Sequence, residues 1–229
     1  MRPLLLLSVV VMLSLAFFQC TTPTPDDPIS ISRLTAVKTS RFAADPDTVA
    51  VPPTDSLQQY FIEDYDSVGK VVKVTYYSAD GEPQAIFENE YQHNLKVANT
   101  FKGEDGTIYS KNQFSYDDSG REIESKSFSV GGEQTGQQRR RYREDGRIME
   151  AIAVDTTGAQ WRYATYYYDD QDREIQLDEY SEDGELIAVV RSVYGKENEN
   201  GDWLECFKYI NDTLRSVEVR EYIYVVDEE

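Results

Sequence analysis

From residue 57 onward, apolar and polar residues alternate over short stretches and do not recur at the helical interval of three to four positions. The stretches KVVKVTYYS (70–78) and WRYATYYY (161–168) show this pattern. They are rich in valine, threonine and tyrosine, which pack well on a pleated sheet. Polar clusters that contain glycine separate such stretches and are typical of turns. The pattern predicts an all-β protein.

A tyrosine followed by acids, glycine and arginine, as in SYDDSGR (115–121), belongs to a repeat. The tyrosine recurs every 25 or 26 residues, at Tyr65, Tyr91, Tyr116, Tyr142, Tyr168 and Tyr194. A second series of glycines falls between the tyrosines, at Gly81, Gly106, Gly132, Gly158 and Gly184. Because the same element occurs six times, it indicates a scaffold rather than a single reaction centre.

Each unit of about 26 residues has two turns, which leaves room for two strands. Asp-Gly, Gly-Gly and Ser-Gly pairs suit tight hairpins, since glycine adopts positive φ without steric cost. We therefore predict an antiparallel meander of about twelve strands built from six two-stranded repeats. Open sheets of more than about ten strands tend to curl, so a curled or half-barrel single sheet is expected.

Alignment of the units reveals columns of similar residues. The first column is basic and follows the tyrosine turn, at Lys70, Lys96, Arg121, Arg147 and Arg173. We expect these side chains to form ion pairs with acids of the same turn; a strip that binds anions is the alternative. Two further columns are mostly apolar and are predicted to share one face, at Val72, Ala98, Ile123, Met149, Ile175 and at Val74, Thr100, Ser125, Ala151, Leu177. The column between them is polar and is predicted to face water, at Lys73, Asn99, Glu124, Glu150 and Gln176.

The first 20 residues have one positive charge, at Arg2, and an apolar run from Leu4 to Phe18. The run fits the central region of an export signal and is shorter than the roughly 20 residues of a membrane-spanning helix. The segment resembles the signal of bacterial lipoproteins, in which Cys20 would carry the lipid. We predict a signal peptide at 1–19 and lipidation at Cys20, and hence an outer-membrane lipoprotein of the cell envelope, periplasmic or surface-facing. Ordinary secretion and an uncleaved anchor are the alternatives.

Residues 20–56 contain six of the eight prolines, with threonine, serine and aspartate between them. Such a composition buries little apolar surface and favours extended conformations. It predicts a disordered tether that connects the membrane anchor to the β-hairpin repeat domain at 57–229.

The net charge of −19 disfavours nucleic acid as a partner, because phosphate backbones are also anionic. The chain has one histidine, His93. It has two cysteines, Cys20 and Cys206. These do not supply the spacing of a zinc site, and no metal or cofactor is predicted. The segment KENENGDW (196–203) lacks an acid at the first position of a calcium loop, although a loose surface calcium site stays an alternative. No nucleophile elbow, phosphate-binding loop or dinucleotide motif appears, so we expect no enzymatic activity.

The repeated tyrosine–acid–glycine–arginine element resembles the YD repeats of Rhs-type proteins and also the hairpins of MORN-like repeats. The resemblance covers roughly residues 59–226 and implies a β-hairpin array. Rhs proteins use such arrays as shells around a toxin domain, a role that is not expected for this chain. The final unit, with Gly201, Trp203, Arg220, Glu221 and Tyr222, is similar to the C-terminal signature of small Bacteroidetes lipoproteins.

A local excess of aromatic residues marks the candidate binding surface. Strand alternation places Trp161, Tyr163 and Tyr167 on one face, and Tyr166 and Tyr168 on the other. The first three could bind a glycan or peptide, or they could cover the sheet as cross-strand pairs. Our main hypothesis is a non-catalytic exported lipoprotein that serves as an envelope scaffold or interaction module. A glycan- or peptide-binding module and an acidic immunity or inhibitor protein are the alternatives.

Overall fold

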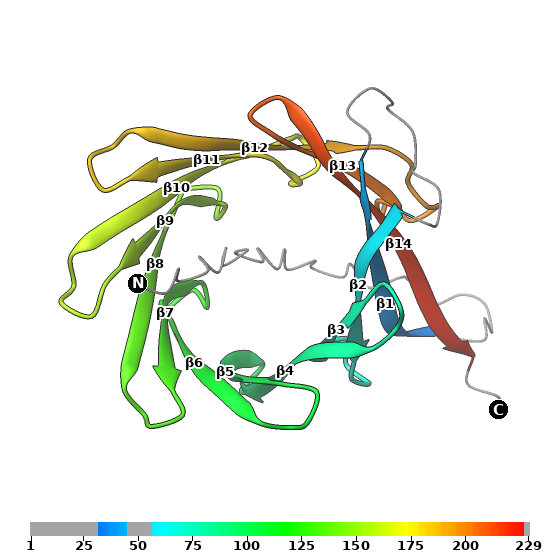
Figure 1. Ribbon diagram of the computed structural model, residues 1–229, viewed down its shortest axis with the longest axis horizontal. Helices are drawn as coiled ribbons and strands as arrows, with labels where there is room; N and C mark the ends of the chain where they lie inside the picture. The colour runs from blue at the N-terminus through cyan, green and yellow to red at the C-terminus, as the bar shows by residue number, and fades with distance from the viewer. Residues whose placement is uncertain (1–31, 45–55, 227–229) are drawn as a thin grey trace, which may run out of the picture.

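The computed structural model of the protein describes residues 32–44 and 56–226. These residues form fourteen antiparallel strands, each hydrogen-bonded to its neighbours in chain order, and β1 pairs with β14 to close a barrel (Figure 1). The strands are β1 (Ser32–Ala43), β2 (Leu57–Tyr65), β3 (Val71–Ser78), β4 (Pro83–Gln92), β5 (Leu95–Lys102), β6 (Ile108–Tyr116), β7 (Glu122–Ser129), β8 (Gln134–Tyr142), β9 (Ile148–Val154), β10 (Gln160–Tyr168), β11 (Glu174–Ser181), β12 (Leu186–Tyr194), β13 (Glu205–Ile210) and β14 (Thr213–Val226).

The prediction of an all-β antiparallel meander is confirmed, but the predicted half-barrel of about twelve strands is wrong. The sheet closes because two long strands meet. Strand β14 pairs with β1 from Ser32↔Val226 to Ala43↔Ser216, and β1 pairs on its other side with β2. The predicted meander did not include β1, because β1 lies outside the repeat. Without this strand, the sheet was expected to stay open.

Strand β1 lies in the segment expected to be a disordered tether, and that expectation is wrong for Ser32–Ala43. The sequence SRLTAVKTSRFA contains no proline. Its alternate residues Val37 and Thr39 are buried, at 2% and 1% exposure. Prolines lie on both sides of this segment, so the whole of 20–56 was predicted to be a tether although 32–43 has a strand pattern of its own.

The repeated turns have the geometry that the glycine series predicts. Gly120 and Gly146 close the tyrosine turns with φ of 77° and 87°, values that glycine adopts without strain. The second unit has Leu95 where glycine was expected. There the chain turns through His93 and Asn94, which both have positive φ, and this shorter turn accounts for the interval of 25 residues.

A β-bulge follows each of the first five tyrosine turns and changes which residues share a face. Ser115 pairs with Glu124 and Tyr116 pairs with Glu122, so Ile123 is the extra residue on β7. The predicted face shared by the two apolar columns is therefore wrong. Ile123, Met149 and Ile175 are each more than a third exposed, whereas Ala151 and Leu177 of the other column are buried.

The two faces of the barrel differ in how large side chains are buried. Tyr166 on β10 is 4% exposed, but its neighbour Tyr167 is 39% exposed. Tyr166 packs in a cluster with Ala151, Ala164 and Leu177. In a closed barrel the concave face is the enclosed one, so these residues belong to the inner face and Tyr167 belongs to the outer face.

The inner face carries aromatic rows and polar contacts together. Rings of Phe61, Tyr76, Phe87 and Phe101 follow one another across β2 to β5, with centroids 5.2, 5.7 and 4.8 Å apart. Next to this row, on β1 and β14, Arg41 donates to Glu218 at 2.6 Å. Stability therefore comes from contacts between adjacent strands, as in other repeat architectures. In the described part of the chain, no helix is both long and apolar enough to cross a membrane.

The pairing of β1 with β14 predicts a specific cross-link. Lys38 and Glu221 are direct partners on the outer face, with Nζ 3.7 Å from Oε1. Replacing both by cysteine, with Cys20 changed to serine, should give a disulfide, because opposite residues on paired strands have Cβ atoms about 5 Å apart. A mobility shift on non-reducing gels that disappears with reductant measures it. The pair Lys38→Cys and Val193→Cys, on unpaired strands, is the control, and an equal yield of both cross-links would contradict the closure.

Candidate functional site

The repeated tyrosine holds neighbouring units together through its hydroxyl group. Tyr142 on β8 donates to the carbonyl oxygen of Glu122 on the preceding strand, β7, at 2.6 Å. The same contact recurs from Tyr91 to Val71, from Tyr116 to Lys96 and from Tyr194 to Glu174, at 2.9, 2.6 and 3.0 Å. Burial of these rings raises the pKa of Tyr116 to about 12, so its hydroxyl stays protonated and can donate at neutral pH.

The three arginines of the basic column each have two partners, one in their own turn and one in the next unit. Asp117 accepts hydrogen bonds from the backbone N–H of Ser119 and Arg121 and also from Arg121 Nε at 2.8 Å. The predicted ion pairing within the turn is thus confirmed for Arg121, and Arg173 makes the same pair with Asp169. These backbone and side-chain hydrogen bonds hold the pKa of Asp117 below its usual value.

The contact of these arginines with the next unit was not foreseen from the sequence. The guanidinium of Arg121 lies 5.0 Å from the ring centroid of Tyr142, and that of Arg173 lies 4.7 Å from the ring of Tyr194. Such cation–π contacts add stability at partly exposed sites. The basic column is therefore occupied in structural contacts along the repeat.

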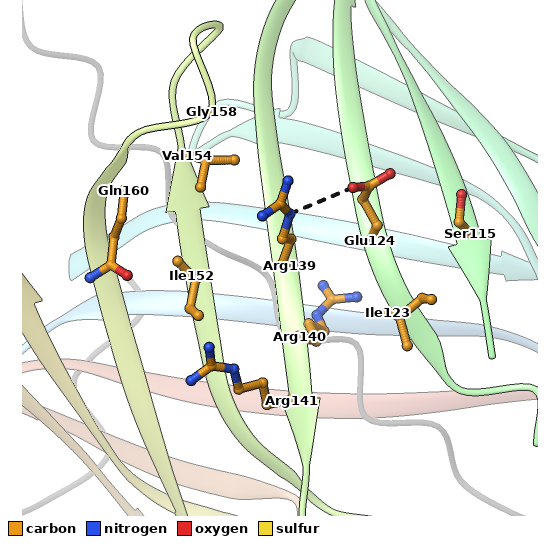
Figure 2. Close-up of a pocket in the computed structure, with 10 residues that line it drawn as sticks. All are labelled: Ser115, Ile123, Glu124, Arg139, Arg140, Arg141, Ile152, Val154, Gly158 and Gln160. Atoms are coloured by element: carbon orange, nitrogen blue, oxygen red, sulfur yellow. Dashed lines mark ion pairs between the residues drawn. The ribbon is translucent and has the colours of Figure 1, made fainter.

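A different basic cluster borders a groove on the barrel wall. The groove has a volume of about 450 Å³ and lies across strands β6 to β10 (Figure 2). It is lined by Ser115, Ile123, Glu124, Arg139, Arg140, Arg141, Ile152, Val154, Gly158 and Gln160. This volume falls in the range of small-molecule sites.

The register of the strands explains why these residues meet. Arg139 on β8 is opposite Glu124 on β7 and Ile152 on β9. Positions 139 and 141 share one face because strand side chains alternate. That face is the outer one, since Arg140 between them pairs with Glu122 on the inner face. Arg140 borders the groove as well, although its guanidinium is held inside.

The two outward guanidinium groups are only partly neutralised by their neighbours. Arg141 Nη1 lies 3.0 Å from Glu150 Oε2, and Arg141 is 64% exposed. Arg139 Nε lies 3.7 Å from Glu124 Oε1, beyond hydrogen-bond distance, and its side chain is 54% exposed (Figure 2). Glu124 is shared, since it also pairs with Lys126 at 3.0 Å and accepts from Gln137.

Buried apolar side chains form the floor of the groove. Ile152 and Val154 on β9 are 8% and 3% exposed. Ile152 lies between Arg139 on one side and Tyr163 of β10 on the other. The groove thus places cationic groups next to an apolar floor and an aromatic ring, in a chain whose overall charge is −19.

The predicted aromatic row does not form a single surface with equal exposure. Tyr163 is half-buried and stacks on Tyr180 of β11, with centroids 4.7 Å apart and planes 9° apart. Trp161 sits at a register shift of β10, is 49% exposed and contacts the Arg162 guanidinium. Tyr167 is 39% exposed on the outer face, so Tyr163 is the member of the row that adjoins the groove.

The other candidate residues have structural surroundings. Cys206 is fully buried, and burial raises the pKa of its thiol to about 11, which keeps it protonated at neutral pH. Asn198 accepts hydrogen bonds from the backbone N–H of Asn200 and Asp202 and so shapes its own turn. Within 32–44 and 56–226, no group of three or more metal-ligating side chains is assembled. The expected signal peptide and Cys20 lie outside the described residues.

The groove could not be assigned from the sequence alone, although one signal was present. The segment QQRRRYR (137–143) carries four of the chain's bases and no acid. Strand alternation separates Arg140 from Arg139 and Arg141, but only the register of β7, β9 and β10 shows what lies beside them.

No protein-family model matches the chain, and no curated protein matches it in sequence. Among solved structures, the fold is similar to a porin-like protein from Bacteroides uniformis, with a TM-score of 0.50 at 10% identity, over 84% of this chain and 96% of that one. A putative outer membrane lipoprotein-sorting protein domain from Vibrio parahaemolyticus gives a TM-score of 0.32 at 8% identity, over 89% of each chain. The TcdB2-TccC3 structure gives 0.30 at 11% identity, and there the match covers 80% of this chain and 11% of that chain. At these identities the first likeness shows the fold alone.

The tyrosine contact predicts a measurable contribution to stability. Tyr142→Phe removes the hydroxyl that donates to Glu122 but keeps the ring beneath Arg121. We expect the free energy of unfolding to fall by about 1 kcal/mol, the usual value for one hydrogen bond. Urea denaturation followed by circular dichroism measures it. Tyr109→Phe, at a ring that is 53% exposed, is the matched control and should change stability by less than about 0.5 kcal/mol. Equal effects of the two substitutions would contradict the role of Tyr142.

Proposed function

We propose that the protein is an exported lipoprotein, anchored to the outer membrane through Cys20, whose barrel is a non-catalytic interaction scaffold of the cell envelope. The observation that carries the proposal is the N-terminal sequence, in which a short apolar run ends at Cys20. The strand β1 then begins 12 residues after this cysteine, which separates the barrel from the lipid by a short proline-containing linker.

The barrel supports a scaffold role because its repeated residues are engaged in contacts within the fold. The tyrosines, the turn acids and most of the basic column bind one another or the backbone. We further propose that the repeat is of the YD type. The support is that the tyrosine, the aspartate and the arginine each have a defined contact in successive units.

Both faces of the barrel wall carry charged side chains, which favours water on the outer side of the sheet. The outer face presents ion pairs such as Lys73–Asp64 and Arg141–Glu150, each at 3.0 Å and with partly exposed side chains. Exposed pairs of this kind add little stability but keep the surface hydrated. In our proposal the barrel is therefore held at the membrane by the lipid and extends into an aqueous compartment.

A ligand-binding role is the second candidate, and the outer groove favours it. Its lining combines Arg139 and Arg141 with a buried apolar floor, a combination that the structural repeat does not require. In this reading the scaffold displays the groove away from the membrane.

The lipid anchor predicts the outcome of a labelling experiment. Cells that express the full chain and grow in labelled palmitate should incorporate label into the protein, and the protein should sediment with membranes. Cys20→Ala should abolish both, because the thiol that carries the lipid is absent. Cys206→Ala is the matched control and should keep the label. Label retained in the Cys20→Ala variant, or absent from the unmodified chain, would contradict the anchor.

A further inference from the structure

We infer that the outer groove binds a carboxylate-bearing glycan, with Arg139 and Arg141 holding the acid group and the Tyr163–Tyr180 pair supporting a sugar ring. The inference rests on the second candidate under the proposed function, a scaffold that displays a ligand site, and it assigns that site a ligand class.

A continuous row of outward residues runs across four strands at the groove. The Cα partners are Arg139 with Ile152, Ile152 with Tyr163, and Tyr163 with Tyr180. At about 4.8 Å between strands, the row from β8 to β11 spans ~14 Å. It presents a cation, an aliphatic side chain and two aromatic rings in that order, which forms an elongated surface with one charged end.

The charged end is suited to a carboxylate. Arginine presents a planar fork of N–H donors that can bind both oxygens of a carboxylate. The outward positions of β7 to β9 hold three bases, Lys126, Arg139 and Arg141, against two acids, Glu124 and Glu150. Three positive and two negative charges leave a net charge of +1 there, opposite in sign to the whole chain.

The aromatic end is suited to the apolar side of a sugar ring. Tyr163 and Tyr180 stack on each other almost in parallel, so their rings are fixed and lose little conformational freedom on binding. Ile152 supplies apolar contact between these rings and the arginines, while Gln160 and Ser115 supply hydrogen-bonding groups at the margin. This combination of a few polar groups around an apolar floor is typical of ligand sites.

An acidic peptide fits the groove less well than a glycan. Peptides commonly bind sheets by adding a strand to a free edge. Both edges of every strand from β6 to β11 are already paired in the closed barrel. A ligand in the groove therefore meets side chains on the face of the sheet, without backbone donors or acceptors to align a peptide.

The inference is tested by titration calorimetry of the full chain in detergent with galacturonic acid oligomers. The unmodified protein should bind them, and a neutral galactose oligomer of equal length should bind at least tenfold more weakly. Arg139→Gln with Arg141→Gln should lower the affinity about tenfold or more, since each lost charged hydrogen bond is worth roughly this factor. Tyr163→Ala should weaken binding of the acidic oligomer severalfold.

Matched variants separate a lost contact from a lost fold. Arg191→Gln, at an outward arginine of β12 that pairs with Asp212, should leave the affinity within about twofold. If the double glutamine variant does not fold, the double lysine variant keeps both charges. It should still lose affinity, because lysine lacks the bidentate fork.

Three results would overturn the inference: no binding of the acidic oligomer, equal binding by the double variant, or equal or tighter binding of polyglutamate. Palmitate labelling at Cys20 is a separate measurement. If the glycan does not bind but the label is incorporated, the inferred ligand is wrong and the proposed anchoring stands.

Discussion

The hydrogen-bond ladder between β1 and β14 is the interaction on which the rest of the structure depends. Residues 170 or more positions apart in the chain pair over the full length of β1, and the meander becomes a barrel only through them. Closure removes the unpaired edges that would otherwise invite association with other strands. It also creates distinct inner and outer faces, which is why Tyr166 is buried and Tyr167 is exposed although they are adjacent.

Between the closing strands, local contacts repeat from one unit to the next. Four of the repeated tyrosines donate to a backbone carbonyl of the preceding strand, and in Tyr91, Tyr142 and Tyr194 the base of the preceding turn also lies over the ring. These contacts hold successive hairpins in register without a large central apolar core. The inner face can therefore combine aromatic rows with ion pairs such as Arg41–Glu218. A scaffold of this kind leaves the outer face free to vary, and the groove beside Arg139 and Arg141 occupies part of that face.

The sequence was sufficient to predict what depends on local chemistry. The tyrosine and glycine intervals gave the strand class, the hairpin order and the turn-local pair of Arg121 with Asp117. The sequence was insufficient where one extra residue changes the face on which the following side chains lie. It was also insufficient where segments far apart in the chain pair with each other. The extra residue Ile123 reverses the alternation after the turn, and nothing in its neighbours marks the bulge. Strand β1 carries no copy of the repeat, so its pairing partner could not be read from spacing. The groove depends on the register of five strands, and only its arginines were visible in the sequence.

Hydrogen exchange of the β1 amides tests the central claim most directly. In a closed barrel the amides of Val37 to Arg41 lie between two paired strands, so the account predicts that they exchange as slowly as those of β9 and β10, through global unfolding. Exchange of these amides at the rate of the exposed turns, while β9 and β10 stay protected, would contradict the account, because the sheet would then be open at β1.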